Sequence, residues 1–117
     1  TSKKNILRKI KLFNLSNIQI IEGPFEKTVK KFFTKKRNIF ACNIDCDLYS
    51  GYKAILPYIY RDLSINGYVH LDEYFSLKYP GARIACDEFF EQNNIKPLKN
   101  KTDDREFERW YFTKKKY

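Results

Sequence analysis

The chain has 117 residues, of which 43% are apolar and 17% aromatic, so it can bury one hydrophobic core but is too short for two ordinary domains. Basic residues number 23 against 14 acids, and the net charge of +9 permits a polyanionic partner without requiring one. No apolar run approaches bilayer length and no signal-peptide core is visible, so we expect a cytoplasmic single domain over residues 1–117 that does not enter a membrane and keeps its three cysteines reduced.

Two hydrophobic periodicities alternate along the chain. Apolar residues at helical spacing predict helices at Lys3–Leu12, from Pro24 to about Lys36, at Ser50–Leu63 and at Pro80–Gln92. Runs of β-branched and aromatic residues predict strands at Ile18–Ile21, Ile39–Ile44, Tyr68–Leu71, Ile95–Leu98 and Arg109–Thr113, with a turn at Asn66-Gly67. This alternation is typical of a doubly wound α/β sheet with helices on both faces.

Acidic residues follow two successive predicted strands. Asp45 and Asp47 come after the first, and Asp72 and Glu73 come after the second. Ligands of open α/β sheets bind beyond the carboxyl ends of the strands, so Asp45, Asp72 and Glu73 are expected in one crevice. Carboxylates gathered there repel one another unless a hard cation such as Mg²⁺ lies between them. The alternative is that they are solvated turn residues or helix N-caps, and Asp47 precedes Tyr49 where an N-cap would stand.

At these motifs the sequence resembles the macrocin O-methyltransferase family. The family's "DxDxY" strand end, "GG" turn with "DDY" strand end, "PG-x-R-x-A-x-DEF" helix start and upstream "G-x-F-x-x-T" segment correspond to Ile44–Tyr49, Asn66–Tyr74, Tyr79–Phe90 and Gly23–Thr28. The resemblance covers nearly the whole chain from about residue 18. It implies a Rossmann-like class I methyltransferase that uses S-adenosylmethionine and Mg²⁺ to methylate a hydroxyl of a sugar or similar small acceptor.

Site residues follow from this resemblance position by position. It implies Asp45, Asp72 and Glu73 as metal ligands, Gly23 and Phe25 as cofactor-binding residues, and Asp47, Tyr74 and Arg83 as substrate contacts. It assigns no general base. Glu73 stands where the family usually has Asp, and Asn66 replaces the first glycine of the "GG" turn. Asparagine tolerates a positive φ, so we expect the turn to survive.

The glycine-rich cofactor loop of class I methyltransferases is missing. The four glycines are isolated from one another, and no G-x-G cluster occurs. By resemblance, with the family's strand order 3-2-1-4-5-7-6, the chain is the C-terminal part of the domain and lacks the first two strands; Thr1 in place of Met agrees with a fragment. We expect the chain to be inactive alone and the Ile39–Ile44 edge to invite self-association.

Two other functions fit the sequence. The chain is a non-catalytic remnant or interaction subunit if it has kept the fold and lost the cofactor loop. It is a basic nucleic-acid-binding module if the runs Lys27–Arg37 and Lys114–Lys116 form a binding face, although no nucleic-acid recognition motif supports this. Cys42, Cys46 and Cys86 lack zinc-site spacing and are predicted to be structural thiols, and the single histidine, His70, is predicted to be a packed residue.

Overall fold

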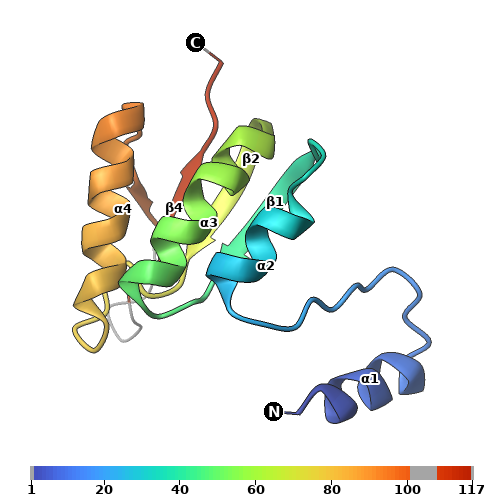
Figure 1. Cartoon of the computed structure of the whole chain (residues 1–117). Helices are drawn as coiled ribbons and strands as arrows, with labels where there is room; N and C mark the ends of the chain where they lie inside the picture. Colours follow the sequence, from blue (N-terminus) through green and yellow to red (C-terminus); the bar gives the residue numbers. More distant parts are fainter. Residues whose placement is uncertain (1, 101–107, 117) are drawn as a thin grey trace.

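A computed structural model of the chain describes residues 2–100 and 108–116. Along the chain the elements are α1 (Lys3–Leu12), α2 (Phe25–Phe32), β1 (Ile39–Ile44), α3 (Tyr49–Asp62), β2 (Leu63–Leu71), α4 (Pro80–Asn93), β3 (Leu98–Lys99) and β4 (Trp110–Thr113) (Figure 1). Within the described residues, no helix has the length and apolar character needed to cross a membrane.

The strands form one mixed sheet in the order β1-β2-β4-β3. β1 and β2 are parallel, with Cys42 opposite Val69 and Ile44 opposite Leu71, whereas β4 runs antiparallel to both β2 and β3. Helix α3 connects the two parallel strands, as a parallel pair requires. The predicted alternation of strand and helix is therefore confirmed from residue 25 onward.

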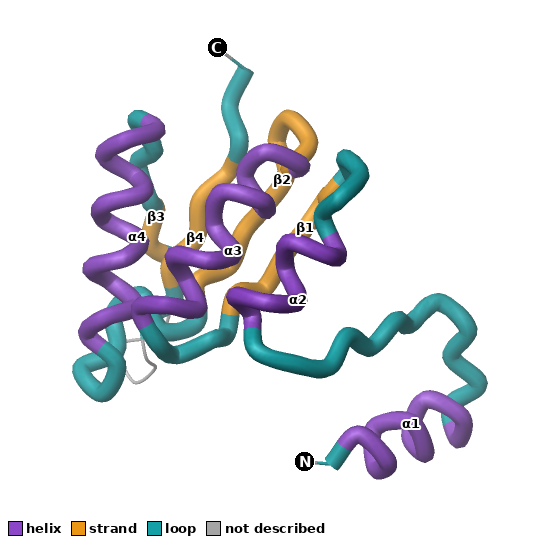
Figure 2. Tube along the Cα trace, in the orientation of Figure 1, coloured by secondary structure: helices purple, strands orange, loops and turns teal. Residues whose placement is uncertain are grey.

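Helices α2, α3 and α4 lie side by side across one face of the sheet (Figure 2). Between this helical layer and the strands lies the hydrophobic core, in which Tyr52, Leu56, Val69, Leu71 and Phe112 have no exposed surface. Phe112 of β4 contacts the rings of Phe90 and Tyr60 at centroid distances of 5.4 and 6.3 Å. These ring contacts join β4 to α4 and α3.

The opposite face of the sheet carries no helix in the described part of the chain, so the prediction of helices on both faces is met on one face only. Because side chains alternate along a strand, Tyr68 and His70 point away from the core that Val69 and Leu71 enter. Their β1 partners Ala41 and Asn43 are exposed. Tyr68 stacks on Tyr111 of β4 at 4.9 Å on this face.

Some predicted elements differ from the structure. Ile18–Ile21 is extended but not a strand, because no described strand lies beside it to complete a ladder. The Asn66-Gly67 turn lies inside β2, where Asn66 takes a left-handed φ of 63° and the register with β1 shifts. The last strands were predicted at Ile95–Leu98 and Arg109–Thr113 and lie at Leu98–Lys99 and Trp110–Thr113.

Candidate functional site

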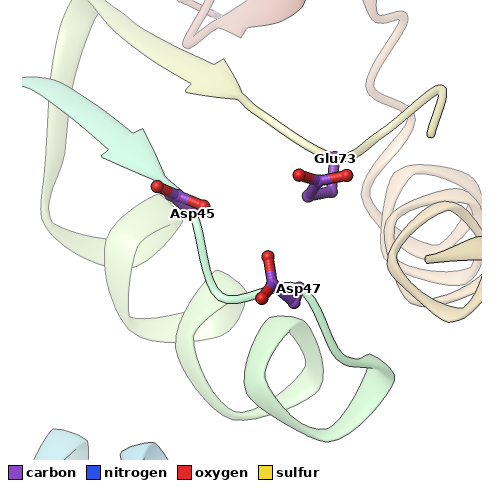
Figure 3. A group of neighbouring side chains, drawn as sticks. All are labelled: Asp45, Asp47 and Glu73. Carbon is purple, nitrogen blue, oxygen red and sulfur yellow. The ribbon is translucent and has the colours of Figure 1, made fainter. Parts of the chain in front are cut away.

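Three carboxylates meet where β1 and β2 end. Asp45 directly follows β1, Asp47 lies two residues further on, and Glu73 lies two residues beyond β2. Carboxylate oxygens from these three residues lie within 4.8 Å of one another (Figure 3). The strand ends are joined by a hydrogen bond of 3.0 Å from the Asp72 N–H to the carbonyl of Ile44. The parallel pairing thus places Asp45 and Glu73 at one edge of the sheet, as the sequence predicted.

Asp47 reaches this group through its backbone conformation. Its φ of 55° is left-handed, a region that Asp enters more readily than most residues. The chain turns there before α3, and the Asp47 carboxylate lies opposite Asp45 and Glu73 (Figure 3). The alternative prediction of Asp47 as an N-cap is wrong, because the N-cap of α3 is Leu48 and no side chain caps that helix.

The hydroxyl of Tyr52, on α3, joins the ends of β1 and β2 by two hydrogen bonds. The ring of Tyr52 is fully buried, its hydroxyl donates to the carbonyl of Ile44 at 3.0 Å, and the N–H of Glu73 donates to the same hydroxyl at 3.3 Å. Burial raises the pKa of Tyr52, so the hydroxyl keeps its proton. Sequence reasoning missed this residue; its signal was a hydroxyl on an otherwise apolar helical face.

Asp72 lies beside the group but is not part of it. Its carboxylate accepts a hydrogen bond from Arg109 at 3.0 Å and lies 3.8 Å from Nε2 of His70. His70 points to the open face of the sheet, since its neighbour Leu71 enters the core. Of the three ligands that the resemblance implied, the structure therefore gathers Asp45 and Glu73 and places Asp72 against Arg109.

Two cavities border the acids. The larger has a volume of about 820 Å³ and is lined by Asp72, Glu73, Phe75, Ser76, Leu77, Lys78, Tyr79, Glu108 and Arg109. The smaller, of about 430 Å³, is lined by Asp47, Leu48, Tyr49, Ser50, Lys78, Tyr79, Pro80 and Gly81. Lys78 and Tyr79 line both, so the segment before α4 separates a space beside Glu73 from a space beside Asp47.

Tyr74 and Arg83 were predicted to contact substrate. Tyr74 is 6% exposed, packs on Trp110 at 5.3 Å and donates its hydroxyl to Asp87 at 2.6 Å. Arg83 lies 3.5 Å from the Asp87 carboxylate and 4.7 Å above the Phe75 ring. Among these aromatic and basic side chains, Phe75 is the one that lines the larger cavity. Tyr74 and Arg83 do not line either of the two cavities, and Arg83 lies over the ring of a residue that does.

The chain has three cysteines, and Cys46 stands between Asp45 and Asp47 in the sequence. Cys86 is fully buried, and Cys42 and Cys46 are half-buried. Burial raises the pKa of Cys42 to about 11, and burial together with Asp47 and Asp45 raises the pKa of Cys46 to about 12. All three are free thiols, as predicted, and at neutral pH they are protonated.

Gly23 and Phe25 lie at the start of α2. The neighbouring Glu26 adds a small part to the raised pKa of Cys46, after burial, Asp47, Asp45 and Cys42. All four glycines are packed within the chain, because a Cβ at any of them would come within 3.0 Å of a neighbouring atom. No two of these glycines stand at the G-x-G spacing of a nucleotide-binding loop.

The donor set at the strand ends fits a hard divalent cation. Carboxylate oxygens are the ligands that Mg²⁺ prefers; at bond lengths of about 2.1 Å its adjacent octahedral ligands lie about 3.0 Å apart and its opposite ligands about 4.2 Å apart. The Asp45, Asp47 and Glu73 oxygens lie within 4.8 Å of one another, so side-chain rotations that draw them together would bring them to these spacings. Asp45 is exposed, and Asp47 and Glu73 are half-buried, which leaves room for water ligands.

Known proteins resemble this chain over part of their length. The structure matches the O-methyltransferase NovP with a TM-score of 0.80 and 22% identity, over 99% of this chain and 46% of that chain. It matches CalS11, a TDP-rhamnose 3'-O-methyltransferase of calicheamicin biosynthesis, with a TM-score of 0.67 and 25% identity, over 80% of this chain and 40% of that chain. The chain thus spans less than half the length of either, and no curated protein matches it in sequence.

The chain also matches a protein family over most of its length. Residues 1–107 match the macrocin O-methyltransferase (TylF) family, which includes Asp45, Asp47, Asp72 and Glu73 and all helices of the fold. Members of this family use S-adenosylmethionine. The chain therefore belongs to the macrocin O-methyltransferase family.

Proposed function

We propose that this chain forms the metal-binding and acceptor-binding side of an O-methyltransferase that methylates a hydroxyl of a sugar or similar small molecule. The observation that carries the proposal is the group of Asp45, Asp47 and Glu73 at the ends of two parallel strands. A cavity of about 820 Å³ beside Glu73 has room for a monosaccharide. Family membership and the CalS11 match support the reaction class.

Charge explains why these carboxylates favour a cation. Like charges within 4.8 Å repel one another, and a divalent ion between them replaces that repulsion by attraction. Asp72 is already balanced by Arg109. We therefore assign Asp45, Asp47 and Glu73 as the primary ligand set, with Asp72 as the neighbouring carboxylate that the family pattern adds.

The chain's own residues then orient the acceptor. Tyr52 fixes the backbone on which Glu73 stands, and Lys78 and Tyr79 form the wall between the two cavities. Lewis acidity, which lowers the pKa of an acceptor hydroxyl, is the chemistry that a divalent cation supplies when bound. Methyl transfer also needs a donor site, and this chain lacks its cradle, so we expect no methylation by the chain alone.

Calorimetric titration with Mg²⁺ and then Mn²⁺ tests the proposal. Wild type should bind one ion, and Asp45→Asn should weaken binding by about tenfold or more because one charged ligand is lost. Glu91→Gln, an exposed acid near the end of α4, is the matched control and should bind as wild type does. Equal affinities for wild type and Asp45→Asn would contradict the proposed site.

The remnant alternative predicts a different result. A chain that has kept only the fold has no reason to retain a cation site, so its titration with either metal would be flat. Titration with S-adenosylmethionine alone does not separate the two, since both expect no binding. The metal titration is therefore the discriminating experiment.

A further inference from the structure

We propose that Phe75 is a specificity-determining residue for the acceptor, and that Arg83 is the positioning residue that fixes its ring. Phe75 touches the acceptor, whereas Arg83 acts only through Phe75. The way in which the ring is held follows from the fold. Its contact with an acceptor rests on the proposed function.

Phe75 is an aromatic side chain held at the wall of the larger cavity. It lies two residues after Glu73, lines the same cavity of about 820 Å³ and is 42% exposed. Its ring lies nearly parallel to that of Trp110, at 5.6 Å and 14°, and the guanidinium carbon of Arg83 lies 4.7 Å from the ring centroid. Small-molecule sites are lined mainly by apolar and aromatic side chains, so the exposed part of this ring is a surface for the acceptor.

Arg83 keeps its place through Asp87, one turn further along α4. Its Nε lies 3.5 Å from the Asp87 carboxylate, and the two side chains are 52% and 50% exposed. An ion pair this exposed contributes little to stability. The pair instead orients the guanidinium over the Phe75 ring, where the cation is attracted to the face of the ring.

Tyr74 holds the same segment from the side of the core. It is 6% exposed, packs on Trp110 at 5.3 Å and donates its hydroxyl to Asp87 at 2.6 Å. Burial and this hydrogen bond raise the pKa of Tyr74, so the hydroxyl keeps its proton and donates at neutral pH. Asp87 therefore joins α4 to two consecutive residues, to Tyr74 directly and to Phe75 through Arg83.

Leu77 lines the same cavity in a different way. Its side chain is 98% exposed, so little of the protein packs against it. A side chain with rotamer freedom adapts to acceptors of different shape, whereas a ring fixed before binding favours those whose surface matches it. Of these two apolar side chains, Phe75 is therefore the one that discriminates between acceptors.

The remaining lining of the cavity is largely polar. It includes Glu73, Ser76, Lys78 and Arg109. An acceptor in this cavity thus meets an aromatic surface of fixed orientation together with carboxylate, hydroxyl and cationic groups. A pyranose has the matching chemistry, because its ring carries an apolar C–H face and its hydroxyl groups lie at the edge.

A double-mutant cycle tests both roles. The probe is methyl β-D-glucopyranoside, a pyranose whose two ring faces carry C–H groups, titrated into the chain in Mg²⁺ and followed by NMR of isotope-labelled phenylalanine rings. Phe75→Leu should weaken binding of the probe about fivefold, and Arg83→Gln about threefold. The double variant should bind as Phe75→Leu does, because Arg83 makes no contact with the acceptor of its own.

Two further variants are matched to these changes. Leu77→Ala trims the other apolar side chain and should weaken probe binding by less than about twofold. Lys53→Gln breaks a comparably exposed ion pair with Glu88 and should leave the Phe75 resonances in place. Without the probe, Arg83→Gln should shift those resonances and leave the melting temperature close to that of wild type.

Each failure has its own meaning. Additive losses in the double variant would overturn the positioning role and make Arg83 a direct acceptor contact. Equal probe affinity in wild type and Phe75→Leu, or no probe binding by a chain that binds Mn²⁺, would overturn the role of Phe75. A chain that binds no Mn²⁺ would contradict the proposed function instead, and unshifted Phe75 resonances in Arg83→Gln would still overturn the positioning role.

Discussion

The carboxyl end of the sheet and the free edge of β1 belong to the same strand and differ in how far this chain completes them. At the carboxyl end, the carbonyl of Ile44 accepts hydrogen bonds from the Asp72 N–H and the Tyr52 hydroxyl, and the carboxylates of three acids lie close together. Along the edge, Phe40 is exposed and residues 2–24 lie apart from the sheet. The difference indicates that the chain organises the carboxyl end of β1 with its own hydrogen bonds and side chains, and leaves the outer edge of the same strand exposed.

The largest expected effect contrasts the core with the edge. Phe112→Ala should lower the free energy of unfolding by about 3–5 kcal/mol, because a fully buried ring is lost from between the sheet and two helices. Phe40→Ala should change it by less than about 0.5 kcal/mol, because that ring is 80% exposed. Urea denaturation followed by circular dichroism measures both. A large loss for Phe40→Ala would mean that the edge is already covered.

The next effect concerns Asp62, the buried acid at the end of α3. It accepts hydrogen bonds from Arg61 at 2.6 Å and from the N–H of Arg37 at 2.9 Å. Asp62→Asn should cost about 1–3 kcal/mol, because one of the two acceptor oxygens becomes an NH2 group that cannot accept, and the Arg61 guanidinium loses its charged partner. Thermal melting compared with an exposed control, Glu91→Gln, checks this value.

The same acid makes stability depend on pH. The Arg61 hydrogen bond holds the pKa of Asp62 below its ordinary value of 3.8. The contribution of ionised Asp62 to the free energy of unfolding is therefore complete above about pH 4 and is lost as pH falls through the lowered pKa. The difference in melting temperature between wild type and Asp62→Asn should shrink toward pH 2. A difference that stayed constant with pH would contradict the ionised pairing.

Tyr52→Phe should have a moderate effect on stability and a clear effect on cation binding. The hydroxyl joins Ile44 to Glu73, so its loss should cost about 1 kcal/mol. Because Glu73 then loses its backbone anchor, Mn²⁺ affinity should fall by about tenfold. Calorimetry measures the affinity, and Tyr58→Phe in the same helix serves as the control. Unchanged Mn²⁺ affinity in Tyr52→Phe would show that Tyr52 does not position Glu73 for cation binding.

The smallest expected effect tests the role of Asp72. Arg109→Gln removes a positive charge from beside the acids and should tighten Mn²⁺ binding roughly threefold, whereas Arg109→Lys should not. Stability should change by less than about 1 kcal/mol, since the pair is partly exposed. Asp72→Asn should weaken binding less than Asp45→Asn does. An equal loss in both would make Asp72 a full ligand, as the family pattern implies.

Local patterns predicted much of the fold and the position of the site. Continuous apolar residues at Ile39–Ile44 marked β1, and acids directly after two strands marked the site, because parallel strands end at one edge. The strand at Ile18–Ile21 could not be judged in this way, since a strand also needs a neighbour. Residue periodicity carries no information about which neighbour is present.

The partner of each acid could not be predicted from the sequence either. Asp47 joins the group through a left-handed φ, and Asp72 pairs with Arg109, which is 37 residues away in sequence. Tyr52 acts through a hydroxyl whose partners are backbone groups on two different strands. Each of these depends on tertiary geometry that no spacing in the sequence encodes.

Paramagnetic broadening by Mn²⁺ tests the cation site most directly, because it locates the ion as well as detecting it. Substoichiometric Mn²⁺ added to isotope-labelled protein should broaden amide resonances around Asp45, Asp47 and Glu73 first and leave those of α1 and Glu91 sharp. Mg²⁺ added in excess should restore them. Broadening centred elsewhere, or spread evenly over the exposed acids, would contradict a cation site at the ends of β1 and β2.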